Sequence, residues 1–226
     1  YMSLGRKGLT RDRLAYLVPE ETNIDFDAVF NDLRRLIFIK ELSNDILVLH
    51  DKVADWTQEG LYGVTTARYR KFNQRLVEMY HQEIEKVDKE IERLSPKAYP
   101  IGGEEGWTES EPFTLLKDPP SALYTKEFRE LRRHRRNLLV ERMSYALRAD
   151  PVLGYKQYFE LAEEAFNVGR MDYESQIRAE FLSWWDHQEP VNSKNFKNRQ
   201  MAKESGLGEE YIWADFAVRA IQREYN

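Results

Sequence analysis

Apolar residues recur at every third or fourth position from Thr66 to Leu94, and this pattern sets the strongest limit on how the chain can fold. The positions that share the spacing are Tyr69, Phe72, Leu76, Tyr80, Ile84, Val87, Ile91 and Leu94. Such spacing places side chains on one face of an α-helix. The sequence therefore predicts one long connecting helix over residues 66–94, whose apolar face must be covered by other elements.

The same helical spacing continues through residues 123–226. A helix is expected to begin near Thr125, and Asp150 followed by Pro151 predicts the start of another, because Asp caps helices and Pro is favoured at their first position. Later apolar stripes comprise Tyr155, Tyr158, Phe159, Ala162, Tyr173, Ile177, Phe181, Trp184, Trp185, Ile212, Trp213 and Phe216. The region predicts a bundle of paired helices that is repeat-like but has no fixed period.

Residues 95–122 separate these two helical regions. Prolines and paired glycines break this stretch at Pro96, Pro100, Gly102, Gly103, Pro112, Pro119 and Pro120. Such a composition excludes long regular elements, so a linker or mobile loop is expected there.

Residues 1–65 have a different pattern, which predicts a winged helix-turn-helix domain. Thr10 and Asp25 are expected to cap two helices, the second with an inner face of Phe26, Val29, Phe30, Leu33 and Leu36. Residues 37–42 and 46–49 are rich in β-formers around the polar turn Ser43-Asn44-Asp45, which predicts a hairpin. A further helix is expected to start with Asp51 as its cap. The whole fold is thus predicted to be mostly α.

Composition narrows the class of protein. Hydrophobic residues make up 42% of the 226 residues and charged residues 32%, enough apolar surface for a buried core. The absence of cysteine excludes disulfides, thiolate metal sites and cysteine nucleophiles. No run is long and apolar enough to cross a membrane, so a cytoplasmic protein is expected. Met2 stands at the second position, which favours a segment of a longer protein.

Motifs for catalysis are missing from the sequence. There is no phosphate-binding Gly-x4-Gly-Lys-Ser/Thr loop, no His-Glu-x2-His and no Gly-x-Ser-x-Gly. The four histidines lie far apart at positions 50, 81, 134 and 187, and no cluster of metal ligands is apparent. We expect the chain itself not to be an enzyme, to need no cofactor in isolation and to hold no metal.

The most informative short motif is Leu49-His50-Asp51, at the predicted junction of the second hairpin strand and a helix. A helix start offers free N–H groups and favours a nearby anion. Asp51 can accept from those N–H groups while His50 points a donor toward the anion. The alternative is that Asp51 only caps the helix and His50 only packs at the end of the strand.

Residues of about 10–65 resemble the winged-helix domain of STAND-class signal-transduction ATPases, the group of the apoptotic protease-activating factors and plant resistance receptors. Residues 46–56 look like that family's Met-His-Asp segment, with Leu49 in place of Met. The resemblance implies that His50 touches the β-phosphate of bound ADP and that Asp51 orients the turn. It covers about a quarter of the chain, and the P-loop and magnesium-binding strand of the family are missing.

This resemblance implies a non-catalytic regulatory fragment that contributes to ADP-bound autoinhibition. ADP or ATP would bind only within a longer parent ATPase with a role in defence. Its partners would be an upstream nucleotide-binding domain and downstream sensor repeats, while the helices serve domain contacts or oligomer assembly. The alternative is a DNA-binding winged-helix regulator with a C-terminal dimerisation or sensor domain. The expected recognition helix carries acidic residues and the chain has a net charge of -5, and both disfavour binding of nucleic acid.

A second motif is a run of arginines at helical spacing, Arg129, Arg132, Arg133 and Arg136. Positions i, i+3, i+4 and i+7 share one helix face, so these cations repel one another unless an anion neutralises them. Internal carboxylates from 83–92 or 160–164, solvation, nucleic acid, nucleotide and a partner protein remain open as alternatives. Trp184-Trp185 and the aromatic residues of 155–159 are interpreted as core, and paired acids such as Glu163-Glu164 as solvated surface.

Overall fold

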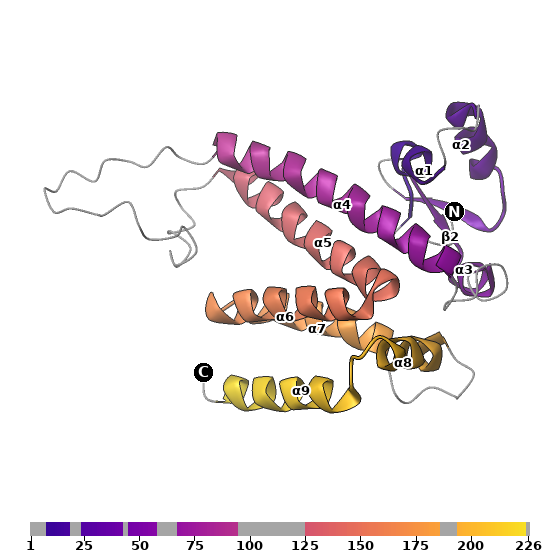
Figure 1. Ribbon diagram of the computed structural model, residues 1–226. Helices are drawn as coiled ribbons and strands as arrows, with labels where there is room; N and C mark the ends of the chain where they lie inside the picture. The colour runs from indigo at the N-terminus through magenta and orange to yellow at the C-terminus, as the bar shows by residue number, and fades with distance from the viewer. Residues whose placement is uncertain are drawn as a thin grey trace, which may run out of the picture.

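The protein is mostly helical, with one small antiparallel sheet near its N-terminus (Figure 1). The computed structural model describes residues 8–18, 24–42, 45–57, 67–94, 125–185 and 194–224. The predicted loop at 95–122, the turn residues Ser43 and Asn44, and Gly60 and Gly63 lie outside the described residues.

The N-terminal elements form a compact group around the sheet. Thr10 caps α1 (Arg11–Leu17), and the Asp25 carboxylate accepts hydrogen bonds from two backbone N–H groups at the start of α2 (Phe26–Arg34). Strands β1 (Ile39–Leu42) and β2 (Ile46–Leu49) pair antiparallel, with Ile39 opposite Leu49. Leu9 exchanges two backbone hydrogen bonds with Leu47, so the segment before α1 lies along the outer side of β2.

The core of this group comes from each of its elements except α3. The buried side chains are Leu9, Leu14, Leu17, Phe30, Ile39, Leu47 and Leu49. The expected inner face of α2 is only partly correct. Phe30 is buried, whereas Val29 and Leu36 are 38% and 39% exposed because no other described element covers that side of the helix.

Helix α3 (Asp51–Thr57) follows β2 directly, and α4 (Ala67–Leu94) is the predicted long helix. One end of α4 packs on α1, and the helix runs beside α5 (Figure 1). Its buried side chains include Tyr69, Phe72, Leu76, Tyr80 and Ile84, which confirms that part of the predicted stripe. Toward its C-terminal end Val87, Ile91 and Leu94 are only partly buried.

The remaining described helices form the C-terminal bundle, in which contacts run mainly between helices that follow one another in the chain. They are α5 (Lys126–Ala149), α6 (Pro151–Asn167), α7 (Met171–Trp185), α8 (Lys194–Glu204) and α9 (Glu209–Glu224). Thr125 caps α5 and Asp150 caps α6, with Pro151 in the first turn of α6, as predicted. The chain reverses within one residue between α5 and α6, so their adjoining ends are in close contact.

Aromatic rings fill the centre of the C-terminal bundle. Tyr158, Phe181, Trp184 and Trp185 are buried, and the rings of Tyr158 and Phe181 stack at 4.4 Å between centroids. This confirms the expected core packing of the tryptophan pair. Phe159 differs, since it is 40% exposed and is covered on one face by the Arg219 guanidinium, 4.9 Å from the ring centroid. None of the described helices has the length and apolar character needed to span a membrane.

Candidate functional site

His50 lies between the end of β2 and the start of α3, and its backbone is held on both sides. Its N–H donates to the carbonyl of Phe38 at 2.9 Å. Its own carbonyl accepts from Val53 at 2.8 Å and from Ala54 at 2.9 Å, the first hydrogen bonds of the helix. These hydrogen bonds therefore fix the backbone of His50. The imidazole takes part in none of them.

The position of Asp51 differs from the expected helix cap. The helix begins with Asp51 itself, so its carboxylate belongs to the first turn and the residue before it provides the capping carbonyl. The side chains of His50 and Asp51 are exposed, and neither makes a hydrogen bond or ion pair within the part of the chain that the structure describes. An imidazole and a carboxylate are thus presented next to each other on a fixed backbone.

An apolar surface lies beside this junction, and sequence reasoning missed it. Leu36, Ile37 and Phe38 run from the end of α2 into β1, next to His50, whereas Leu42 ends that strand opposite Ile46, at the other end of the hairpin. Ile37 is fully exposed, and the exposed fractions of Leu36, Phe38 and Leu42 are 39%, 40% and 50%. The signal was the run of four consecutive apolar residues from Leu36, which is longer than one buried face of a strand requires.

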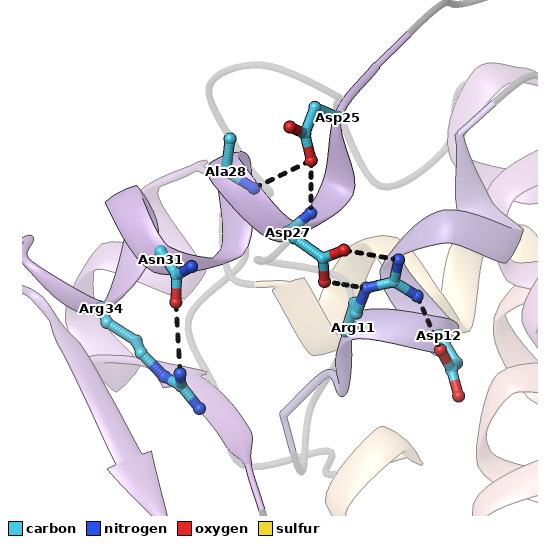
Figure 2. Close-up of polar contacts among 7 residues, drawn as sticks. All are labelled: Arg11, Asp12, Asp25, Asp27, Ala28, Asn31 and Arg34. Atoms are coloured by element: carbon cyan, nitrogen blue, oxygen red, sulfur yellow. Dashed lines mark hydrogen bonds and ion pairs between the residues drawn. The ribbon is translucent and has the colours of Figure 1, made fainter.

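The arginines on and beside α2 are paired with acidic side chains. Figure 2 shows Arg11 of α1 directed at the Asp27 carboxylate, with Asp25 capping the helix beside it. Arg34 forms ion pairs with Glu41 at 2.8 Å and with Asp45 of the hairpin turn. Arg35 lies 3.5 Å from Asp32. The electrostatic surface of this helix is therefore close to balanced rather than basic.

The second predicted site is the arginine stripe on α5, whose members differ in exposure. Arg129 and Arg133 are exposed, while Arg132 and Arg136 are partly buried over aromatic rings, 5.9 Å from Phe128 and 5.6 Å from Tyr173. Burial lowers the pKa of Arg136, and the positive charges of Arg132 and Arg133 lower it further. The positive charges of Arg132 and Arg133 therefore disfavour the charged form of Arg136.

Acidic and histidine side chains do not form a metal-binding cluster among the described residues. No group of three or more His, Asp or Glu side chains is placed to hold a metal ion there. The acidic pairs Glu163-Glu164 and Glu209-Glu210 are exposed, as expected, whereas Glu104-Glu105 lies outside the described residues.

Comparison with known proteins did not provide a relative for this chain. No protein-family model, no curated protein sequence and no solved structure matches it.

Proposed function

We propose that this chain is a regulatory, non-catalytic part of a STAND-type nucleotide-dependent switch, and that residues 8–57 form its winged-helix module. The supporting observation is the order of elements around the small sheet: a strand-like segment at Leu9, two helices, and a hairpin whose second strand pairs with that segment. This is the order expected of a winged helix-turn-helix unit. The hairpin then leads directly into the His50-Asp51 junction that the family resemblance singles out.

The junction suits contact with an anionic group from another domain. His50 is exposed, its backbone is fixed by Phe38 and Ala54, and it stands at a helix start, where the partial positive charge favours a phosphate. In the proposed switch the imidazole donates to the β-phosphate of ADP held by an upstream nucleotide-binding domain. That contact stabilises the closed, inactive arrangement and is lost on activation.

The exposed apolar surface of Leu36, Ile37 and Phe38 fits the same proposal. Apolar side chains grouped on a surface mark a protein contact more often than a nucleic-acid contact. In the proposed switch this surface packs against the upstream domain beside His50. Contact and nucleotide sensing then belong to one interface.

The DNA-binding alternative finds less support in the side chains. Recognition of a phosphate backbone needs cations that are free to release counterions. The arginines on and beside α2, namely Arg11, Arg34 and Arg35, each have an acidic partner. Binding DNA would require breaking these pairs and exposing Asp27, Asp32 and Glu41 to the phosphates.

Two steps test the proposal. The coding sequence upstream of Tyr1 is read for a Gly-x4-Gly-Lys-Ser/Thr loop and, further on, for a hydrophobic strand that ends in paired acids. In the parent protein, His50→Ala is then expected to speed ADP release by about tenfold, the loss of one charge-assisted hydrogen bond. His134→Ala, which removes an exposed histidine on α5, is the matched control and should leave release unchanged.

Opposite results would contradict the switch. If no nucleotide-binding domain precedes the chain, the proposal fails. It also fails if ADP release from the His50→Ala variant equals that of the His134→Ala variant. Salt-sensitive binding of duplex DNA by the 226-residue chain would favour the winged-helix regulator instead.

A further inference from the structure

Some arginines of α5 contact side chains of α4, and others do not. The two sets lie on different faces of the helix. On the face toward α4, Arg135 forms an ion pair with Asp88, and the Arg142 guanidinium lies 3.5 Å from His81 Nδ1. On the other face, Arg129 and Arg133 have no ion-pair partner among the residues that the structure describes. We refer to Arg129, Arg133 and Arg136 as the basic stripe. This stripe is therefore available to an anionic group from outside the chain.

An acidic surface of matching spacing lies on the next helix. Glu160, Glu163 and Glu164 are exposed and stand at positions i, i+3 and i+4 of α6, so they share one helix face. Glu160 is 3.8 Å from Lys156, while Glu163 and Glu164 have no ion-pair partner within the described parts of the chain. We refer to these three residues as the acidic face.

The stripe and the acidic face are neighbours but do not neutralise each other within one chain. Tyr173 is close to both, because its ring is under Arg136 and its pKa, raised to about 12 mainly by burial, is raised further by the negative charge of Glu164. In Figure 1 α5 and α6 meet at their junction and diverge toward the start of α5. The burial pattern agrees, since residues 138–148 are almost all buried and residues 129–137 are not.

We propose that two copies of this chain associate through these surfaces, the basic stripe of each copy on the acidic face of the other. A positive and a negative surface side by side are self-complementary under a two-fold axis, so each contact is made twice. The separation also fits, because Arg129 and Arg133 are four residues apart, like Glu160 and Glu164, which is about 6 Å along a helix. Arginine forks bind carboxylates through paired hydrogen bonds.

Nucleic acid fits the stripe less well than a second copy. Exposed Glu127 and Glu130 flank the arginines on α5 and would repel a phosphate backbone. The nearby rings of Phe128 and Tyr173 are buried and already contact arginines, so they offer no face on which a base can stack. A short carboxylate surface needs no such stacking face and makes fewer contacts with Glu127 and Glu130 than an extended phosphate backbone would.

The test is the molar mass of the 226-residue chain by sedimentation equilibrium in low and high salt. The wild type is expected to dimerise reversibly, with a dissociation constant at least about tenfold larger at 0.5 M salt than at 0.05 M, because salt screens exposed charges. Arg129→Glu/Arg133→Glu should be monomeric at concentrations where the wild type is dimeric. The control Lys52→Glu/Lys71→Glu reverses two exposed cations elsewhere and should dimerise like the wild type.

Charge exchange makes the test specific for this pairing. Glu163→Arg/Glu164→Arg should also be monomeric alone, and mixing it with Arg129→Glu/Arg133→Glu should restore association. Circular dichroism of each variant confirms that the helices remain folded.

A monomeric wild type at low salt would overturn the proposal, as would a dimer that Arg129→Glu/Arg133→Glu leaves intact. It would also fall if the two monomeric variants fail to associate. Binding of RNA or DNA by a monomeric wild type, lost in Arg129→Glu/Arg133→Glu, would assign the stripe to phosphate instead. None of these results depends on nucleotide, so the dimer and the proposed switch stand or fall separately.

Discussion

Gly154 lies in α6 where this helix leaves the end of α5, and the space around it excludes any side chain. A Cβ added at this position would come within 2.3 Å of the Leu147 backbone nitrogen and 2.5 Å of the Leu147 Cα. Backbone atoms cannot move aside as the end of a flexible side chain can. The close approach of α5 and α6 therefore depends on the missing side chain of this residue.

Gly154→Ala should lower the free energy of unfolding by about 2 kcal/mol, the cost of overpacking a tight contact. The sign is diagnostic, since Gly→Ala inside an exposed helix normally stabilises by about 1 kcal/mol. Urea unfolding followed by circular dichroism measures the difference. Exposed Ala179 provides the comparison, because Ala179→Gly should cost only that helix propensity. A Gly154→Ala protein as stable as the wild type would refute the contact.

Sequence patterns predicted the burial of single residues well on α4, and less well on α2 beside the sheet. The spacing that includes Leu76, Tyr80 and Ile84 correctly indicated buried positions on α4. The same reasoning failed for Val29 and Leu36, because spacing shows which residues share a face but not whether another element covers it. Gly154 gave no local signal, since its role comes from the packing of two helices.

At the scale of elements, Arg13 connects α1 with α4. Its guanidinium donates to both carboxylate oxygens of Glu83, at 3.0 Å and 2.7 Å, and lies over the Tyr80 ring, 5.0 Å from its centroid. Burial acts most strongly and lowers the pKa of Arg13, but the hydrogen bonds to Glu83 together with the electrostatic contributions of Tyr80, Glu83 and Tyr145 outweigh it, so the pKa is raised overall. The Tyr80 ring in turn stacks on Tyr145 of α5, which links the N-terminal elements to the bundle.

A double-mutant cycle of Arg13→Met and Glu83→Gln measures how strongly these elements are joined. We expect a coupling free energy of about 1–2 kcal/mol, above the usual value for exposed pairs, because the pair is partly buried and bidentate. The exposed pair of Arg93 and Glu90 on α4 is the control and should give less than about 0.5 kcal/mol. Equal coupling in both cycles would show that burial of the Arg13 pair adds nothing.

The predicted elements agree with most of the observed ones for a physical reason. Caps such as Thr125 and Asp150, and the proline after Asp150, act within one turn of the helix that they start, so they can be recognised locally. The start of α3 was assigned to the wrong residue because the backbone of His50, bonded to Phe38 across the hairpin, sets it. Such a contact between separate segments cannot be recognised from the local sequence.

At the scale of the whole molecule, one buried cluster runs from Leu9 in the N-terminal group to Ile212 in the last helix. Helix α4 is the element that both parts share, since it contacts α1 on one side and α5 on another. Most helices could be predicted from their own periodicity, but α8 could not, because its sequence is mostly polar. The pairing of α4 with α5 could not be predicted either, because a stretch of about thirty residues separates them. The continuity of the core is thus a property of packing rather than of any one segment.

This continuity predicts how the molecule responds to a cut between α4 and α5. A specific protease site introduced within residues 95–124 and then cleaved should leave two fragments that still co-elute on size exclusion, because the buried faces of both helices remain in contact. Adding Tyr80→Ala should weaken this association, since it removes the ring that stacks on Tyr145 and leaves a cavity, a loss of about 3 kcal/mol or more. His81→Ala, one residue away and exposed, should leave the fragments together. Fragments that separate without denaturant at micromolar concentration would mean that the linking segment, and not the helix contact, holds the two parts of the molecule together.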